Sequence, residues 1–210
     1  MLILAGTALA GGFGDPWVDF VFAADRILVG HVVRMEVVDV EHVAVTRITI
    51  AVEAAVFGPT TDRLVLTVPY DATTSVVGEC FLRAAPNAGD DILFAAAPFA
   101  RGPFATTSPP QVQLLGYVRS TDTPYGRRMV DDTGNFVGGV SCENGLAQAG
   151  SESESPWPTW PRSPWDGPDP AALASRQAAA LDWTAGVGQV AACLAAITGH
   201  QAADPGHFEN

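Results

Sequence analysis

Two neighbouring stretches decide the fold of this chain: Arg26-Ile-Leu-Val-Gly-His-Val-Val-Arg-Met-Glu-Val-Val38 and Val43-Ala-Val-Thr-Arg-Ile-Thr-Ile-Ala-Val-Glu-Ala-Ala-Val-Phe57. Both are rich in β-branched residues, which fit a pleated strand better than a helix. In the second stretch Ile48, Ile50 and Val52 alternate with polar or small residues, a period of two that is typical of a strand with one buried face. The polar segment 39–42 separates the two stretches, so we expect a β-hairpin.

Further apolar stretches follow at the spacing of strands joined by turns. Gly58-Pro59 ends the second strand, and the strands that we expect next cover residues 63–70, 92–97 and 112–119. Asp131–Asn135 has the composition of a hairpin turn that joins two short strands. Because turns and not helices link these strands, the pattern predicts an antiparallel barrel or sandwich.

A short helix is expected just before the first strand. Asp15 can cap it, Pro16 can occupy its first turn, and Trp17, Phe20 and Val21 recur at helical spacing. The sequence therefore predicts a helix that leads into the β-rich region.

The charge of the chain limits its partners. Among 210 residues, 23 are acidic and 11 are basic, which gives a net charge of −12. All the basic residues are arginines, a bias that we attribute to a GC-rich bacterial genome. Such a charge repels phosphate backbones and anionic lipid surfaces, so nucleic-acid and membrane-surface binding are disfavoured. No apolar run is long enough to predict a membrane span, and we expect no cofactor.

The N-terminus and the cysteines bear on the compartment. Residues 1–14 contain a short apolar run followed by Ala8-Leu-Ala10, which resembles the end of a secretory signal peptide, although an ordinary apolar N-terminus is an open alternative. In an exported protein Cys80 and Cys142 are the candidates for a disulfide, leaving Cys193 in a helix. Three buried free thiols are the other interpretation. The spacing predicts no zinc or other metal site.

The composition changes near residue 148. Residues 148–168 form a Ser/Glu-rich and then Pro-rich linker that carries Trp157, Trp160 and Trp165. These rings are candidates for stacking on a sugar or docking in a partner groove, or else they pin the linker to the rest of the protein. Residues 169–210 predict a helical segment that opens at Asp169-Pro170. We expect a break at Gly186 and Gly188 and an end at Gly199.

The residues with chemical potential favour structural roles. We interpret Gly89-Asp-Asp91 as a turn before a strand, and Asp131, Asp132 and Asn135 as a solvated hairpin turn without calcium-loop spacing. His31 and His42 have no nearby serine, cysteine or carboxylate pattern, so structural histidines are expected. Ser141-Cys-Glu143 lacks a nucleophile elbow. The sequence therefore predicts no catalytic residues.

Part of the chain resembles the netrin-like domains, the OB-fold barrels of the tissue inhibitors of metalloproteinases and their bacterial secreted relatives. The resemblance covers about a third of the chain and lies in four segments, Ala24–Val32, Val52–Pro59, Gly78–Cys80 and Ala88–Ala95. It implies an OB-like antiparallel β-barrel. The N-terminal Cys-x-Cys through which those inhibitors chelate zinc has no counterpart before Cys80, so the resemblance implies the fold and not that activity.

Together these observations predict an OB-like β-barrel domain over residues 15–147, a linker over 148–168 and a helical segment over 169–210. The expected function is that of a secreted or periplasmic interaction module that binds a protein or glycan without chemistry, through its strand face, the loops 71–77 and 99–110, or the tryptophan segment. One alternative is a protease inhibitor acting through an exposed loop such as Arg101–Ala105. Another is a hydrolase whose site would need a pocket with convergent titratable groups.

Overall fold

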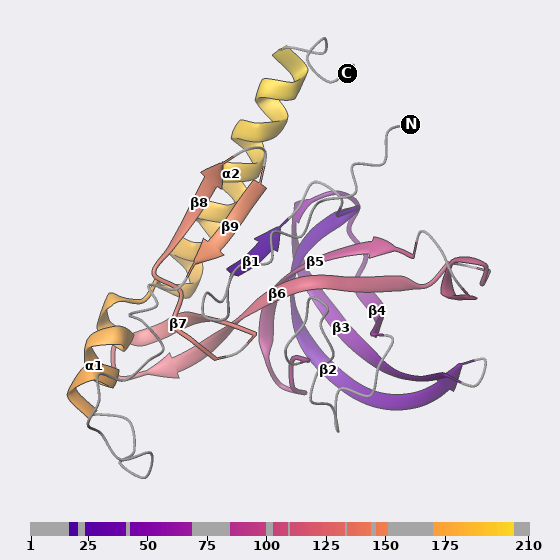
Figure 1. Cartoon of the computed structure of the whole chain (residues 1–210), viewed down its shortest axis with the longest axis horizontal. Coiled ribbons are helices and arrows are strands. Elements are labelled where there is room, and N and C mark those ends of the chain that lie inside the picture. The colour runs from indigo at the N-terminus through magenta and orange to yellow at the C-terminus, as the bar shows by residue number, and fades with distance from the viewer. Residues whose placement is uncertain are drawn as a thin grey trace, which may run out of the picture.

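The computed structural model describes residues 17–20, 24–40, 43–68, 85–99, 103–108, 110–132, 134–143, 146–150 and 170–203. Its fold is mainly β, with two helices in the C-terminal part (Figure 1). The larger sheet has six strands in the order β4-β3-β2-β5-β6-β7. Their bounds are β2 Arg26–Val40, β3 Val43–Phe57, β4 Arg63–Val68, β5 Asp91–Pro98, β6 Val112–Thr123 and β7 Gly126–Asp131.

A second, smaller sheet has the order β1-β9-β8. It consists of β1 Trp17–Phe20, β8 Gly139–Glu143 and β9 Leu146–Gly150, all antiparallel to their neighbours. A 3₁₀ turn, η1 (Pro103–Ala105), lies between β5 and β6. The two helices are α1 (Pro170–Ala179) and α2 (Trp183–Ala203).

The long hairpin predicted from the opening stretches is confirmed. β2 and β3 pair from Ile27↔Phe57 to Val40↔Val43, so the pairing continues into the segment expected to be the turn. The register shifts at three places, and such bulges bend and twist a strand, which agrees with the curved hairpin in Figure 1. At the end of β3, Gly58 has a φ of +77°, and a Cβ there would lie 2.2 Å from the Asp25 carbonyl oxygen, so only glycine fits.

The large sheet curls so that its two faces meet different surroundings. All its pairings are antiparallel except a short parallel contact between β4 and β6, Leu66↔Val112 and Thr67↔Gln113. The concave face buries an apolar cluster that we call the inner core. Its members are Leu28, Val32, Ile48, Ile50, Leu64, Leu66, Val68, Ile92, Phe94, Ala96, Leu114 and Tyr117.

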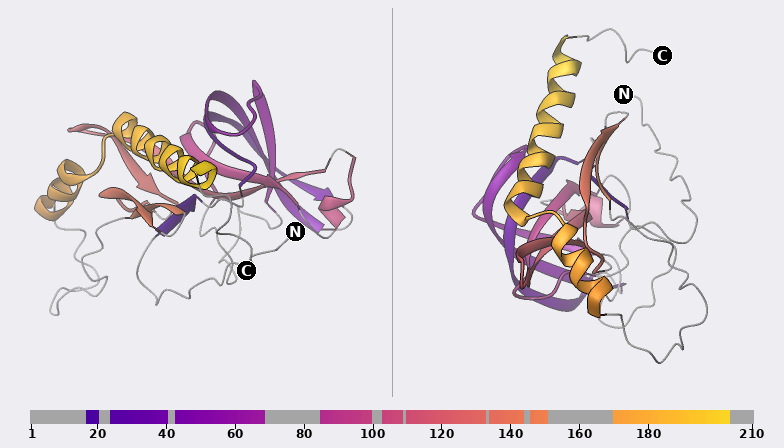
Figure 2. Two further views of the ribbon diagram at one scale, coloured as in Figure 1. Left: turned by 90° about the horizontal axis from the view of Figure 1, so that it is seen from above. Right: turned by 90° about the vertical axis from the view of Figure 1, so that its left-hand side faces the viewer.

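The convex face carries a second cluster, the outer core, which the sheet shares with α2. Its members are Ala24, Ile27, Val29, Leu93, Ala95, Val118, Met129, Val137, Trp183, Val190, Cys193 and Leu194. α2 contacts β3, β7, β8 and β9, and Figure 2 shows the helix lying along the small sheet beside the larger one. α2 therefore packs on the β-domain through the outer core.

The helix expected before the first strand is wrong. Residues Trp17–Phe20 form β1, which pairs antiparallel with β9 from Trp17↔Gly150 to Phe20↔Ala147. Tryptophan, valine and phenylalanine favour strands, and a partner strand distant in sequence supplies the backbone hydrogen bonds that a local helix would have made.

The helical region also breaks at a different place from the one expected. α1 ends at Ala179, and α2 begins at Trp183 after Asp182, whose Oδ1 accepts hydrogen bonds from the N–H groups of Thr184 (3.0 Å) and Ala185 (3.2 Å). That is an N-cap. Gly186 lies inside α2, where a Cβ would come within 2.5 Å of the Met129 Cε, so this glycine permits close packing instead of a break. α2 also continues past Gly199.

Several predictions fall outside the described residues. These are the N-terminal segment 1–14, the loop 71–77, Cys80, most of the linker 148–168, and its tryptophans Trp157, Trp160 and Trp165.

Candidate functional site

A row of polar side chains lies on the outer face of the six-stranded sheet, directly beyond an apolar row of the outer core. In the apolar row Val29 pairs with Leu93. Two residues further along each strand, and therefore on the same face, His31 of β2 pairs with Asp91 of β5. Ser120 of β6 follows in the same row, because the neighbouring pair on β5 and β6 is Ile92↔Arg119. The outer core thus ends in a polar border at this edge.

The side chains of this border form one connected network. His31 Nδ1 lies 2.7 Å from Asp91 Oδ1. Arg127 of β7 donates through its Nη2 to Asp91 Oδ2 and, at 2.7 Å, to Ser120 Oγ. Asp91 therefore stands between a histidine and an arginine and uses both of its oxygens. We call His31, Asp91, Ser120 and Arg127 the polar border.

The order of contacts within the polar border determines what it can do. A carboxylate that accepts from Nδ1–H holds a neutral imidazole with its lone pair on Nε2, as in a catalytic dyad. A serine nucleophile would have to contact that Nε2. Ser120 instead contacts Arg127, on the other side of Asp91 from His31. The described contacts suit recognition by hydrogen bonds better than nucleophilic catalysis.

An open pocket of about 320 Å³ adjoins the polar border. The turn that precedes β5, where Gly89 has a φ of +96°, forms one wall, and the β6–β7 hairpin forms the other. Its lining consists of Gly89, Asp90, Asp91, Ser120, Thr121, Asp122 and Arg127. The turn before β5 is held by a hydrogen bond in which Asp90 Oδ2 accepts the Asn87 N–H at 2.8 Å.

Arg127 also links the pocket to the start of the C-terminal helix α2. The guanidinium carbon of Arg127 lies 5.9 Å from the ring centroid of Trp183, the first residue of α2, which is a cation–π distance. Trp183 is itself buried in the outer core. Arg127 therefore stacks on the core on one side and reaches Asp91 and Ser120 on the other.

Sequence reasoning missed this site, since its members come from four strands. The sequence around His31 shows no carboxylate pattern, because its partner Asp91 lies 60 positions away in the sequence and next to it in the sheet. The expected turn at Gly89–Asp91 is confirmed. The one local signal was a histidine beside Gly30 in the otherwise aliphatic segment 27–33, which marks a point where the buried row gives way to solvent.

The turn at Asp131–Asn135 is confirmed, but it is not solvated throughout. Asp131 is fully buried at the end of β7, and its Oδ1 accepts the Asn135 N–H at 2.9 Å. The carboxylate therefore closes the turn from inside. Among the described residues, no group of three or more His, Cys, Asp or Glu side chains is placed to hold a metal ion.

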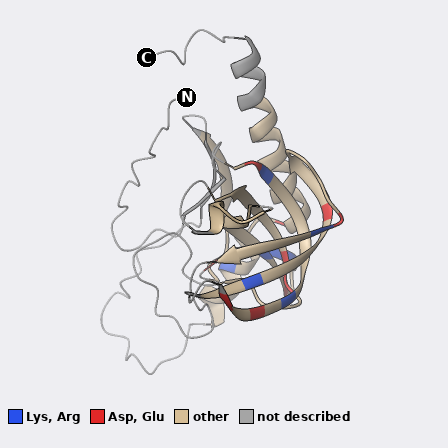
Figure 3. Cartoon of the chain, turned by 90° about the vertical axis from the view of Figure 1, so that its right-hand side faces the viewer, with Lys and Arg blue, Asp and Glu red and all other residues tan. Residues whose placement is uncertain are grey.

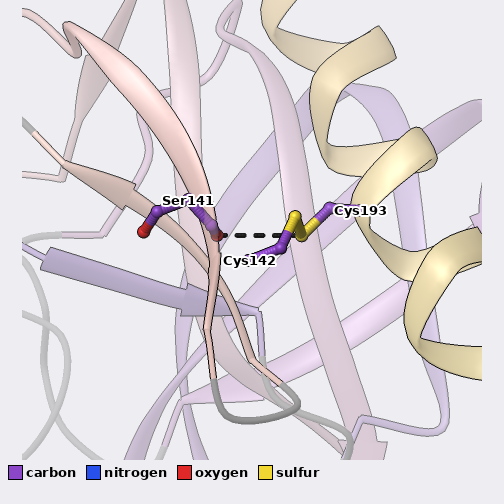
Figure 4. The surroundings of a disulfide bond; sticks show 3 residues. All are labelled: Ser141, Cys142 and Cys193. Atoms are coloured by element: carbon purple, nitrogen blue, oxygen red, sulfur yellow. Dashed lines mark hydrogen bonds between the residues drawn. A yellow bond between two sulfur atoms is a disulfide. The ribbon is translucent and has the colours of Figure 1, made fainter. Parts of the chain in front are cut away.

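The cysteines pair differently from the expectation. Cys142 of β8 is bonded to Cys193 of α2, with a Cα–Cα distance of 5.6 Å, so it is not available to Cys80 (Figure 4). The sheet order explains the difference: α2 lies against β8 and buries Cys193 in the outer core, a contact between segments 51 positions apart.

The bridge also removes a candidate nucleophile. Ser141-Cys142-Glu143 is part of β8, and the sulfur of Cys142 is consumed in the disulfide. The Cys193 Sγ lies 3.7 Å from the Ser141 carbonyl oxygen, a hydrogen bond that only the reduced thiol could donate, since a disulfide sulfur carries no hydrogen (Figure 4).

Comparisons of the chain with models of protein families, with characterised proteins and with solved structures found no match. Among the described helices, none combines the length and apolar character needed to cross a membrane.

Proposed function

We propose that this protein is an exported interaction module that binds a protein or glycan partner without chemistry. The observation that carries the proposal is the division of the outer face of the large sheet. α2 and the small sheet lie over part of it, and the rest, on β2, β3 and β4, exposes apolar and cationic side chains beside the polar border.

The exposed part of this face, which we call the open face, combines two kinds of binding group. Val33 and Val65 are 44% and 47% exposed, which is high for large apolar side chains on strands. Arg47 and Arg63 stand on the same face of β3 and β4, and no described carboxylate forms an ion pair with either of them. Arginine beside apolar surface is a composition enriched at protein interfaces.

Charge supports a specific rather than a diffuse interaction. Seen from the side shown in Figure 3, positive and negative residues are interspersed along the strands of the large sheet. The chain has a net charge of −12, so a face with unpaired arginines is more positive than the average surface of this protein. A partner with hydrogen-bond acceptors and some apolar surface would match it.

The proposed architecture is the OB-like barrel that the netrin-like resemblance implies. Strands β2, β3 and β4 follow one another, and β5 returns to lie beside β2, which is the Greek-key order of such barrels. The parallel contact of β4 with β6 supports closure of the ring. OB-type barrels bind ligands on a strand face and its adjoining loops, and the open face occupies the corresponding strands.

Export is proposed from the disulfide together with the N-terminal sequence. Structural disulfides persist in secreted and periplasmic proteins and are rare where thiols are kept reduced. Cys142–Cys193 joins a strand to a packed helix, the position expected of a structural bridge. A secreted or periplasmic location in a bacterium therefore remains our proposal.

Photo-crosslinking on the open face tests the interaction. A benzophenone amino acid in place of Val65 is expected to form a defined covalent adduct in the exported fraction of the producing cells, and the additional change Arg63→Glu should remove it. The matched control places the same group at Leu173 of α1, which is also exposed. Equal labelling at both positions, or adducts indifferent to Arg63→Glu, would contradict the proposal.

The hydrolase alternative keeps one supporting observation, because the pocket beside the polar border brings together Asp91, Asp122 and Arg127. It requires His31 to act as a base. A panel of chromogenic esters, glycosides and peptides separates the two proposals: turnover that His31→Ala abolishes would favour the hydrolase.

The inhibitor alternative has less support. In the loop between β5 and β6, Phe104 is buried and its ring centroid lies 5.1 Å from that of Phe99, so this side chain packs back on the protein instead of projecting into solvent. Assays against metallo- and serine proteases test what remains of it.

A further inference from the structure

The pocket beside the polar border has a composition that restricts its ligand. Its volume of about 320 Å³ lies at the small end of the range of about 300–1,000 Å³ for small-molecule sites. Such sites are mostly apolar, but this one is lined by carboxylates, hydroxyls and one guanidinium. A ligand that fits must therefore be small and must satisfy hydrogen bonds over most of its surface.

The charges of the lining disfavour an anionic ligand, because three carboxylates, Asp90, Asp91 and Asp122, outnumber one guanidinium. That guanidinium, Arg127, is held in place by Asp91 and Ser120 and stacked on Trp183. A hydroxyl group both donates and accepts, so neighbouring hydroxyls can donate to the carboxylates and accept from the guanidinium. A neutral polyol matches both kinds of wall.

The hairpin that forms one wall of the pocket also carries an exposed aromatic residue. Tyr125 is 47% exposed at the turn of the β6–β7 hairpin, whose two strands supply Ser120, Asp122 and Arg127. The turn is held by hydrogen bonds of Thr123 with the Tyr125 N–H and the Gly126 carbonyl oxygen. Tyrosine combines an apolar ring with a polar tip, which suits it to the C–H face of a sugar ring.

We propose that this pocket binds a neutral sugar residue of a glycan, with Asp122, Ser120 and Arg127 as hydrogen-bonding groups and Tyr125 of the same hairpin as a further contact. The proposal deepens the proposed function, because it selects a glycan over a protein as the ligand at this point of the surface. It is separable from that function, since a protein partner on the open face would need Val65 and Arg63 and not this pocket.

Saturation-transfer NMR on the full oxidised chain tests the proposal. The probes are the methyl glycosides of glucose, galactose, mannose and N-acetylglucosamine, with glucuronic acid as the anionic counterpart. At least one neutral glycoside is expected to bind with a Kd on the order of 1 mM, the affinity of a small polar ligand with few contacts. Glucuronic acid should bind more weakly than the neutral glycosides, because its carboxylate would meet the three carboxylates of the lining.

The variant Asp122→Asn should weaken binding by about tenfold or more, because a charged acceptor is lost from an exposed strand position. Asp62→Asn is the matched control, an exposed carboxylate away from the pocket that should leave binding unchanged. Absence of saturable binding by every neutral glycoside, or binding that Asp122→Asn leaves unchanged, would overturn the proposal. In either case an adduct at Val65 would leave the interaction module standing.

Discussion

The inner and outer cores of this protein are built in opposite ways. The inner core comes from one sheet folding on itself, with members between Leu28 and Tyr117 that recur at strand spacing. The outer core joins that sheet to a helix far along the chain, and its members run from Ala24 to Leu194. The first is held by packing alone, whereas the second is also tied by the Cys142–Cys193 bridge. The large sheet therefore curls around the inner core, and α2 packs on the outer face of this sheet.

The largest effect is expected in the inner core. Phe94 is fully buried on β5, so Phe94→Ala should cost about 3–5 kcal/mol of unfolding free energy, the range for removing a core phenylalanine. β5 carries residues of both cores, so both should unfold together in a denaturant titration followed by circular dichroism. Tyr125→Ala, the exposed aromatic control, should change the stability by less than about 0.5 kcal/mol. A small effect of Phe94→Ala would contradict the assignment of the inner core.

The disulfide should matter next, and mainly for the outer core. It closes a loop with a sequence separation of 51, and disulfides typically contribute about 2–4 kcal/mol of stabilisation. Reduction should speed hydrogen exchange in α2 and β8 more than in the paired region of β3. The double variant Cys142→Ala/Cys193→Ala is the control, since reductant should leave it unchanged. A reductant effect in that variant, in which Cys80 is the one cysteine left, would point to a disulfide between two molecules.

A smaller effect is expected at the start of the helix that covers the outer core. Asp182→Ala removes the N-cap of α2 and should cost about 1 kcal/mol, with faster exchange in the first helical turn. Asp182→Ser keeps a capping oxygen and should recover most of the loss. Equal stability of the two variants would show that packing of Trp183 alone holds this end.

The polar border should contribute least to stability. His31, Asp91 and Arg127 are partly exposed, so Asp91→Asn should cost about 1 kcal/mol or less, and the difference should shrink further at about 1 M salt. Thermal melts at low and high salt measure it. A loss above about 3 kcal/mol would show that this row is part of the outer core and not its solvent edge.

Sequence patterns predicted the strands of this protein better than they predicted the residues of the polar border. The period of two in 43–57 and the β-branched stretch before it predicted β2 and β3 with nearly their observed bounds, because alternation records which face is buried. The helix predicted around Trp17 failed because its residues gained a partner in β9, more than a hundred positions away. Local patterns carry no information on such a partner.

The sequence by itself determined the mainly β fold, the long hairpin, the turn at Gly89 and the helical C-terminal part, since each depends on neighbouring residues. Only the tertiary structure decided which cysteine pairs with Cys142, where α2 begins against the sheet, and that His31, Asp91, Ser120 and Arg127 meet. Those residues come from separate strands, and strand order in the sheet, not distance along the chain, brings them together.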